Sequence, residues 1–527
     1  MKYFNTEGPI NNKKHYYLDP LKRLDLFEIE TLIDREKYFV LHAPRQTGKT
    51  TSMLALMKYL NKQNKYKCLY FNVESAQALR ENIELGIKTI IERLARFEQI
   101  YLKENFFEKE LLKINSGYGA ALANLLSKWA EQSKKPIVLI FDEIDSLVGD
   151  TLISVLRQLR SGYADRPEYF PQSVILCGVR DIRDYRIHSS IEKQIITGGS
   201  CFNIKAESLR LGDFSKIDVF NLINEHEKET AQKFTQNAKE KVYYYSNGQP
   251  WLVNAICYEV CFKMKPAKYR NITITCEMID DAKENLILRK DTHLDQLTDK
   301  LREERVRSVI EPLLVSSSKL QVINEDDLQY VVDIGLIKRK PNVSISNPIY
   351  QEIIPRALIA ATQDMMLQNT FWYQNKDGSL NMDKLLTAFQ DFFAEQSQSW
   401  LERFDYKEAG PQLLMQAFLQ RIINSGGRVE REYGLGTMRT DLLVIWFYGN
   451  KKNKEKQKII IELKLLYKSF KATLEQGLKQ TFEYMDKCLT NEGHLIIFDK
   501  DPQKTWKEKI FKLKKEYNGK KIMVWGA

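Results

Sequence analysis

The sequence predicts a multidomain α/β protein that contains at least one parallel sheet. Three observations lead to this prediction: a length of 527 residues, a regular alternation of short apolar runs and helical stretches between residues 37 and 205, and a second αβ pattern between residues 413 and 527. At roughly 100–200 residues per domain, such a chain forms three or four domains with buried cores.

The first alternating segment contains five runs that we expect to be strands. They lie at residues 38–41, 68–71, 137–141, 174–177 and 202–204. Because these runs are largely apolar and are separated by helical stretches, the pattern favours a parallel sheet with helices on both faces.

Changes in pattern divide the rest of the chain. A helical segment from residue 213 to about 290 is interrupted at 247–250, and helices with a basic turn at 338–340 indicate a winged-helix unit. Residues 365–403 are expected to form a connector with exposed aromatic side chains, namely Phe371, Trp372 and Tyr373. We therefore expect five parts, at residues 1–212, 213–300, 301–364, 365–404 and 405–527.

Composition excludes several classes of protein. Hydrophobic residues make up 43% and charged residues 28% of the chain, which is typical of globular proteins and not of disordered ones. No run reaches the ~18 apolar residues of a membrane-spanning helix, and the first residues lack the apolar core of a signal peptide. The seven cysteines are widely spread, so the sequence predicts no disulfide framework and a cytoplasmic location.

The net charge of +11 is concentrated near the end of the chain. Residues 451–527 contain 19 lysines and ten acidic residues. A basic end is typical of a module that binds a polyanion, so DNA is an expected partner. The alternative is a solvated lysine-rich surface.

A strand–loop–helix pattern at residues 38–57 carries the first chemical motif. Its loop reads Ala43-Pro44-Arg45-Gln46-Thr47-Gly48-Lys49-Thr50-Thr51, which fits the Walker A pattern with Ala in place of the first Gly. Backbone N–H groups at a helix start can bind a β-phosphate. Lys49 is expected to neutralise phosphate charge and Thr50 to ligate Mg²⁺. The expected nucleotide contacts are Gln46, Thr47, Gly48, Lys49, Thr50 and Thr51.

The third apolar run ends in an acidic sequence that completes this predicted site. Asp142 is expected to hold Mg²⁺ through water, and Glu143 to polarise the attacking water. Arg180, after the next run, is either a sensor of the γ-phosphate or a surface arginine. The sequence does not choose an arginine finger among Arg157, Arg160 and Arg186.

These motifs resemble those of the bacterial AAA-like ATPases, which are related to the archaeal ATPase and STAND branches of the P-loop NTPases. The resemblance covers about residues 1–365 and includes Phe4-Asn5-Thr6-Glu7-Gly8-Pro9, His15-Tyr16-Tyr17-Leu18 and Asn247-Gly248-Gln249-Pro250-Trp251-Leu252-Val253-Asn254. It implies ATP and Mg²⁺ as cofactors, an adenine site near 15–18 and a helical lid around 248–250. It also implies a homo-oligomer, or a partner protein that supplies an arginine finger.

A second group of chemically useful residues lies near the end of the chain. We expect a strand at 439–446, a polar turn at 448–454 and a return strand at 459–465. Glu462 and Lys464 are two residues apart and face the same way, so they can meet Asp441 at the edge of the hairpin. Two carboxylates can place Mg²⁺ on a scissile phosphate, and a lysine can offset transition-state charge. The alternative is a solvated hairpin with a cross-strand ion pair.

Asp441 and Glu462-Leu463-Lys464 resemble the PD-(D/E)XK nuclease superfamily, although Thr440 replaces the proline that names the motif. The resemblance covers about residues 405–527 and implies an α/β restriction-endonuclease-like domain. Gln416 stands where many members carry an acidic ligand, with Glu408 or Glu432 as substitutes. Gln480 and Tyr484, one helical turn apart, are either substrate contacts or packing residues.

Together the motifs predict an ATP-binding and ATP-hydrolysing switch coupled to a Mg²⁺-dependent DNA nuclease-like effector. The resemblance alone suggests a role in anti-phage or mobile-element biology. The alternative is a signalling ATPase whose C-terminal domain binds a partner or nucleic acid without cutting, and Gln416 favours it. A processive DNA motor ranks last, because no strand-separation motif is visible.

Overall fold

The computed structural model describes most of the chain as two compact units. The described residues are 1–114, 117–181, 186–189, 194–197, 202–267, 269–289, 292–313, 324–358, 373–401, 415–416, 418–419, 427–435, 438–450, 453–466, 469–499, 501 and 503–527. Unit 1 comprises Met1–His293 and Glu325–Asn342, and unit 2 comprises Leu294–Asn324 and Val343–Ala527.

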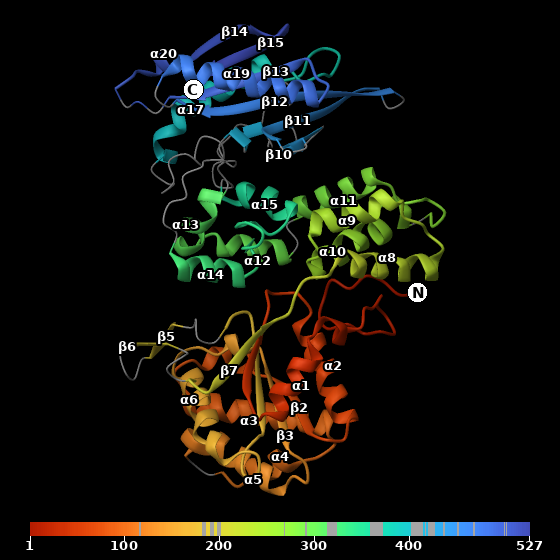
Figure 1. Cartoon of the computed structure of the whole chain (residues 1–527), viewed down its shortest axis with the longest axis vertical. Helices are drawn as coiled ribbons and strands as arrows, with labels where there is room; N and C mark the ends of the chain where they lie inside the picture. The colour runs from red at the N-terminus through yellow and green to blue at the C-terminus, as the bar shows by residue number, and fades with distance from the viewer. Residues whose placement is uncertain are drawn as a thin grey trace. The chain divides into compact units, whose positions relative to one another are not determined.

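Unit 1 is built on a five-stranded sheet in the order β2-β3-β4-β1-β7, in which every neighbouring pair is parallel (Figure 1). The strands are β1 (Tyr38–His42), β2 (Lys67–Asn72), β3 (Ile137–Asp142), β4 (Ser173–Gly178) and β7 (Lys205–Arg210). Four of the five agree with the predicted runs. The prediction of a strand at residues 202–204 was wrong, because Phe202 is a buried core residue and the polar edge strand β7 begins after it.

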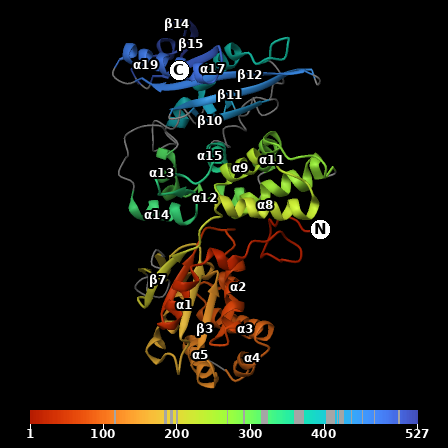
Figure 2. The ribbon, with the colours of Figure 1, turned by 45° about the vertical axis from the view of Figure 1, so that its right-hand side comes forward.

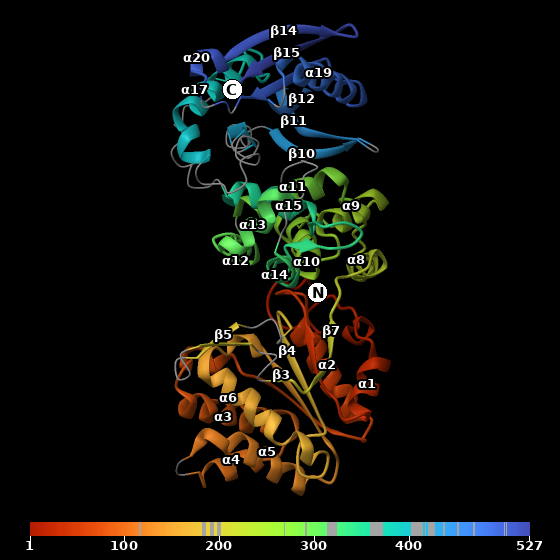
Figure 3. The ribbon, with the colours of Figure 1, turned by 60° about the vertical axis from the view of Figure 1, so that its left-hand side comes forward.

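Helices cover both faces of this sheet, as the apolar runs predicted (Figure 3). On one face α1 (Leu26–Asp34) and α2 (Lys49–Lys62) pack against Phe39, Leu41 and Ile140. The other face carries α3 (Ile83–Tyr101), α5 (Ala121–Gln132) and α6 (Gly149–Ser161). Successive strand residues point to opposite faces, so a run that is apolar throughout supplies both cores.

Two further elements complete the α/β part of unit 1. The short helix α4 (Phe106–Leu111) follows α3, and an antiparallel hairpin of β5 (Arg186–Ser189) and β6 (Gln194–Thr197) lies between β4 and β7 in the chain. The sequence pattern did not predict this hairpin.

The segment after β7 is helical, as predicted, and its helices gather in one group (Figure 2). They are α8 (Lys216–Thr230), α9 (Gln236–Ser246), α10 (Pro250–Tyr258) and α11 (Cys276–Arg289). Ser215 and Asp218 form a capping box at the start of α8. Between α9 and α10 the chain turns through Asn247 and Gly248, both with positive φ, and Phe214 donates its N–H to the Gly248 carbonyl at 2.8 Å.

The segment with the predicted winged-helix unit contributes to both units. Its elements are α13 (Glu304–Leu313), α14 (Glu325–Asp333), β8 (Ile337–Lys338), β9 (Ser344–Ile345) and α15 (Pro348–Leu358), preceded by α12 (Thr292–Lys300). Because the boundary between the units passes through this segment, the division into five parts stays a prediction.

Unit 2 contains a six-stranded mixed sheet in the order β10-β11-β12-β13-β15-β14. The strands are β10 (Gly427–Leu435), β11 (Met438–Asn450), β12 (Asn453–Leu465), β13 (Glu492–Phe498), β14 (Phe511–Tyr517) and β15 (Lys520–Gly526). The first three form an antiparallel meander, and β13 runs parallel to β12. Strands β11 and β12 extend through most of residues 448–454, where a turn was predicted. The predicted turn was therefore too long.

Helices cover both faces of this second sheet as well. On one face α19 (Phe470–Lys487) packs against Leu443, Ile460 and Leu495. On the other, Phe389 and Phe393 of α17 (Met382–Leu401) contact Phe498. The short helix α20 (Trp506–Lys509) precedes β14.

The expected connector is in part a structural element of unit 2. Helix α17 occupies residues 382–401 of the expected range, and Tyr373 is only 6% exposed, so the expectation of an exposed aromatic side chain there was wrong. The indole of Trp446 packs edge to face with Tyr373, which explains its burial. Phe371 and Trp372 lie outside the described residues.

Two exclusions from composition can be compared with the structure. Among the described helices, none has the length and apolarity needed to span a bilayer. The six cysteines in the described part of the chain are free thiols, and Cys257 and Cys261 are buried in α10 and the helical turn that follows it.

We predict that Gly248→Ala destabilises the protein by about 2–4 kcal/mol. The residue has φ of +79°, and a Cβ there would lie 1.9 Å from the Phe214 carbonyl oxygen. Thermal or urea unfolding measures the effect. Gly119→Ala is the control, because a Cβ at Gly119 meets nothing within 4 Å. Equal stability of the two variants would contradict the prediction.

Candidate functional site

The predicted phosphate loop connects β1 to α2. Gly48 stands at the N-cap of α2 with φ of +88°, and Gln46 also has positive φ. No described side chain caps the first turn of α2, so its N–H groups face the loop without a side-chain acceptor. Free N–H groups at a helix start, together with the helix dipole, attract a phosphate.

Lys49 is held across this loop. Its side chain is buried, and Nζ donates hydrogen bonds to the carbonyl oxygens of Ala43 and Pro44, each at 3.0 Å. The Thr47 hydroxyl donates to the same Pro44 carbonyl at 2.8 Å. The ammonium group therefore lies inside the loop, where phosphate oxygens can replace the two carbonyls as acceptors.

Asp142 forms the second half of the site at the end of β3. Its Oδ2 atom accepts hydrogen bonds from the Thr50 hydroxyl at 2.7 Å and from the Tyr70 hydroxyl at 2.8 Å. Its Oδ1 atom accepts the backbone N–H of Glu143 at 3.0 Å. The structure thus brings together Thr50 and Asp142, the two residues predicted to hold Mg²⁺.

The donor set at this corner fits Mg²⁺. A hydroxyl and one carboxylate are hard oxygen ligands, and Mg²⁺ usually binds to one or two carboxylates while it keeps water and substrate phosphates as its other ligands. Within the described residues there is no group of three His, Cys, Asp or Glu side chains that could form an all-protein metal site. The corner is therefore suited to a metal that arrives with a nucleotide.

Glu143 follows Asp142 with a left-handed backbone, φ of +58°. Burial raises the pKa of its carboxyl group to about 7, and the nearby Lys49 ammonium opposes this shift. A carboxyl group with a pKa near neutrality can accept a proton from water and later release it.

A cavity of about 810 Å³ lies beside the phosphate loop and Glu143. The N-terminal segment closes it, because the Ile10 N–H donates to Thr51 Oγ1 at 3.1 Å and the Trp251 indole donates to the Thr6 carbonyl at 3.0 Å. The residues that line it include Tyr16, Leu18, Gln46, Gly48, Lys49, Thr50, Thr51, Glu143 and Pro250, whereas Thr47 and Asp142 are not among them. The segments at 15–18 and 248–250 thus both reach the predicted nucleotide site.

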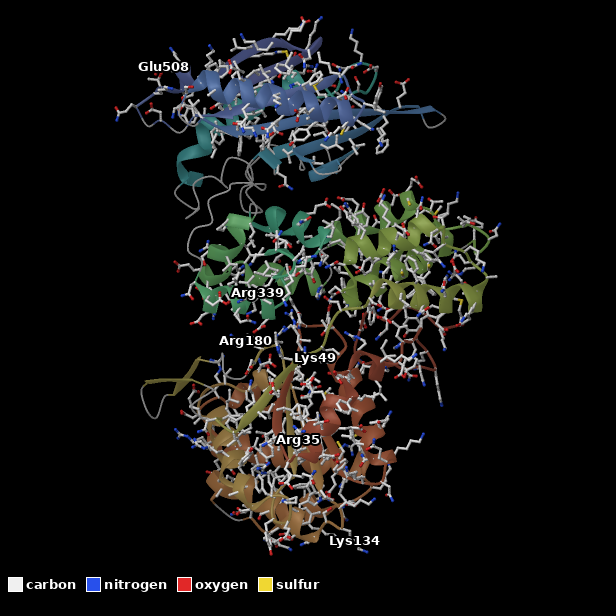
Figure 4. The ribbon with its side chains drawn as sticks, in the orientation of Figure 1. Arg35, Lys49, Lys134, Arg180, Arg339 and Glu508 are labelled. Atoms are coloured by element: carbon white, nitrogen blue, oxygen red, sulfur yellow. The ribbon has the colours of Figure 1, made fainter. Side chains whose placement is uncertain are left out.

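Arg180, the candidate sensor of the γ-phosphate, follows the end of β4. It lies at the same end of the sheet as Lys49 (Figure 4), but it is not among the described residues that line the cavity. Its guanidinium group lies over the ring of Tyr330, 4.8 Å from the ring centroid. Its role as a sensor stays a prediction.

The choice of an arginine finger is also undecided. Arg157 and Arg160 are exposed on α6, and Arg186 lies in β5.

Sequence reasoning missed several residues of the cavity wall, among them Arg23, Tyr70 and Arg93. Tyr70 stood within a predicted strand but was taken only as an apolar residue. Arg93 lies over the ring of Phe97, one helical turn further along α3, and Phe97 in turn contacts Tyr70. The i, i+4 spacing of Arg93 and Phe97 could have predicted their contact from the sequence. Nothing in the sequence indicated that α3 contacts Tyr70.

The C-terminal group lies in unit 2. Glu462 is only 2% exposed on the interior strand β12, and Lys464 Nζ donates to its Oε1 at 2.7 Å. Leu442 pairs with Ile461, so the backbone of Asp441 lies opposite that of Glu462. The burial of this carboxylate contradicts the solvated surface of the alternative prediction, whereas the cross-strand ion pair of that alternative stays a prediction.

Helix α19 covers this part of the sheet. Glu462 pairs in register with Leu495, and a Cβ on Gly477 of α19 would lie 2.6 Å from the Leu495 side chain. One turn along, Gln480 Oε1 is buried and has no hydrogen-bond partner among the described residues, while Tyr484 is packed in the core.

The structure describes some, but not all, of the residues considered for the position of the acidic ligand. Gln416 is buried, Glu432 lies within β10, and Glu408 falls outside the described residues. The described side chains therefore do not show a second acidic ligand for the C-terminal group.

Comparison with known proteins identifies the N-terminal two thirds of the chain. The profile of a family described as "AAA-like domain" matches residues 5–354. The chain belongs to this AAA-like family. As a member it is a P-loop ATPase, and the phosphate loop and acidic β3 end described above lie within the matched range.

Similar proteins come from archaea and bacteria. An uncharacterized ATP-binding protein of Methanocaldococcus jannaschii is 19% identical over 406 residues, which are 68% of this chain and 96% of that protein. The Walker-type ATPase of Pyrococcus abyssi is 14% identical, with a TM-score of 0.46, over 67% of this chain and 99% of its own. The RuvB branch migration motor of Thermotoga maritima has a TM-score of 0.33 at 14% identity, over 63% and 93%.

We predict that Lys49→Ala in this AAA-like site weakens ATP binding roughly 10- to 100-fold, because a charge-assisted hydrogen bond contributes about 1.5–3 kcal/mol. Titration with a fluorescent ATP analogue or calorimetry measures the dissociation constant. Lys58→Ala, at an exposed lysine on the same helix, is the matched control and should bind like the wild type. Unchanged binding by the Lys49 variant would exclude this loop as the nucleotide site.

Proposed function

We propose that unit 1 binds MgATP and hydrolyses it. The observation that supports this most is that the Thr50 hydroxyl and the Glu143 backbone N–H both bond to Asp142, next to a cavity that Lys49, Thr50 and Glu143 line. The α2 N–H groups and Lys49 bind the β- and γ-phosphates, and Thr50 and Asp142 hold Mg²⁺. When bound, Mg²⁺ neutralises the phosphate oxygens and so favours displacement at the γ-phosphorus.

In the proposed reaction Glu143 acts on water. The carboxylate accepts a proton from the attacking water, whose oxygen forms a bond to the γ-phosphorus. The bond between this phosphorus and the bridging oxygen breaks, and that oxygen stays with ADP. Tyr70 orients the Asp142 carboxylate, because its hydroxyl donates to the Oδ2 atom.

We predict that kcat/KM for ATP rises with pH through about 7, because Glu143 must be deprotonated to accept the proton and burial raises its pKa to about 7. Below that value the carboxyl group is protonated and the rate falls. Glu143→Gln should lower kcat roughly 10²- to 10⁴-fold while ATP still binds. Glu84→Gln, an exposed acid on α3, is the control. A rate that is independent of pH between 5.5 and 8.5 would refute the assignment of the base.

We further propose that unit 2 is a Mg²⁺-dependent DNA nuclease-like effector. Its support is the buried Glu462–Lys464 pair opposite Asp441, on a sheet in which an antiparallel meander is followed by α19 and the parallel strand β13. Desolvation of a carboxylate is costly, so its place in the middle of a sheet favours a chemical use. Asp441 and Glu462 are the proposed metal ligands, and Lys464 the proposed partner of the attacked phosphate.

Two features extend this proposal to DNA. The last 77 residues contain 19 lysines and ten acidic residues, which suits a polyanion. Gln480, with a buried and unbonded Oε1 atom, and Tyr484 are the proposed substrate contacts on α19. The second candidate function is binding without cleavage, and the uncharged Gln416 at the place of an acidic ligand favours it.

We predict that the protein nicks or cuts plasmid DNA with Mg²⁺ or Mn²⁺, and that Glu462→Ala reduces the rate by at least roughly 100-fold, because a metal ligand contributes several kcal/mol to catalysis. Agarose gels of a supercoiled plasmid measure this. Glu475→Ala, an exposed acid on α19, should cut like the wild type. DNA binding without any cleavage by the wild type would instead establish the binding function.

Coupling of the two activities is a separate proposal, motivated by their presence on one chain. Cleavage by Lys49→Ala should differ from that of the wild type when ATP is added. If the two proteins cut equally with and without ATP, the two sites act independently.

A further inference from the structure

Arg23 lies in the wall of the nucleotide cavity, between the phosphate loop and the start of the lid. Its Nη1 atom donates to the Thr47 carbonyl at 2.7 Å, and its Nη2 atom donates to the Gly212 carbonyl. The guanidinium plane lies over the ring of Phe214, 4.9 Å from its centroid. One side chain therefore contacts two segments that are far apart in the sequence.

The contact with the phosphate loop is close. A Cβ at Gly48 would lie 3.0 Å from Arg23 Nη1, so the guanidinium group rests directly on the backbone that precedes Lys49. Because the Thr47 carbonyl is held by Arg23, the peptide groups that follow are fixed in one orientation. This orientation determines where the first N–H groups of α2 point.

The contact with the lid is equally direct. Gly212 lies two residues after β7, and Ser215 caps α8, the first lid helix. Between them, the Phe214 N–H bonds to the Gly248 carbonyl in the turn between α9 and α10. A movement of the 212–214 linker is therefore passed to the start of α8 and to the turn that follows α9.

The charge of Arg23 also suits a nucleotide. It has no ion-pair partner within 4.0 Å among the described residues, although Asp213 and Asp218 act on it at longer range. Burial lowers its pKa to about 10, so the group stays charged at neutral pH. A half-buried cation at the edge of a phosphate site gains stability when an anion enters the cavity.

We propose that Arg23 is a positioning residue. It holds the phosphate loop in the conformation that binds the triphosphate, and it links the lid to this loop, so that the effect of ATP binding is transmitted to the lid. This inference rests on unit 1 being the nucleotide site. Lysine cannot replace the arginine, because a single ammonium group does not span two carbonyls in the way a planar guanidinium does.

The test compares Arg23→Ala and Arg23→Lys with Arg35→Ala, a control at an exposed arginine (Figure 4). Both Arg23 variants should raise KM for ATP by at least about tenfold, the loss of one or two charged hydrogen bonds, while kcat changes less than about threefold. Added methylguanidinium should partly restore the KM of Arg23→Ala. A KM within twofold of the wild type in a folded variant overturns the proposal.

Hydrogen exchange on the wild-type protein tests the link to the lid without a substitution. The proposal predicts that ATP slows exchange of the amides at residues 211–216 as well as in the phosphate loop, and that Arg23→Lys loses the first effect and keeps part of the second. Protection of the loop alone in the wild type overturns the link, even if the Arg23 variants do not fold.

The same experiments separate this inference from the proposed hydrolysis. If wild type and Glu143→Gln turn over ATP equally, the proposed hydrolysis fails, and the role of Arg23 is then decided by the dissociation constants for ATP. Unchanged constants in both Arg23 variants overturn it, and a rise of about tenfold supports it.

Discussion

The arrangement of unit 1 depends on the hydrogen bonds of one carboxylate. Asp142 is fully buried, and a buried charge is tolerated only when donors surround it. Its donors come from three places: Thr50 on α2, Tyr70 on β2 and the backbone of Glu143. These bonds fix the start of α2 against the ends of two strands, and with it the phosphate loop. The low polarity that strengthens them also raises the pKa of Glu143, so the rigidity of the site and the basicity of its carboxyl group have one cause.

The sequence was most informative where the functional residues are close together in the chain. The phosphate loop and the acidic end of β3 each occupy a few consecutive residues, and a strand–loop–helix pattern is enough to place their side chains. The lid turn at Asn247–Gly248 was predictable for the same reason, since positive φ leaves a Gly and Asn signature. Likewise the period-two pattern placed Glu462 and Lys464 together on one face of β12, where the structure joins them.

What the sequence could not supply were contacts between distant segments. Tyr70 meets Asp142 across 72 residues, and Arg23 meets Gly212 across 189. In the same way, nothing in the sequence around Arg180 showed that Tyr330 of α14 would lie under its guanidinium group. Strand β7 was misplaced because an edge strand pairs on one side only and needs few apolar residues, so its polar sequence gave no hydrophobic signal.

The two candidate sites differ in how their buried carboxylates are stabilised, and this difference bears on what unit 2 does. Asp142 is held by neutral donors, which leaves its full negative charge available to a cation. Glu462 is bonded to the ammonium group of Lys464, and a buried ion pair of this kind is often no more stable than two apolar residues. The free energy of folding alone therefore does not explain why a Glu and a Lys lie on an interior strand. The proposed nuclease site would give a better explanation, because Glu462 would hold the cation and Lys464 would face the phosphate. On this argument the two proposed functions of unit 2 differ at position 441, because cleavage would need a second carboxylate to share the metal with Glu462, whereas binding without cleavage would not.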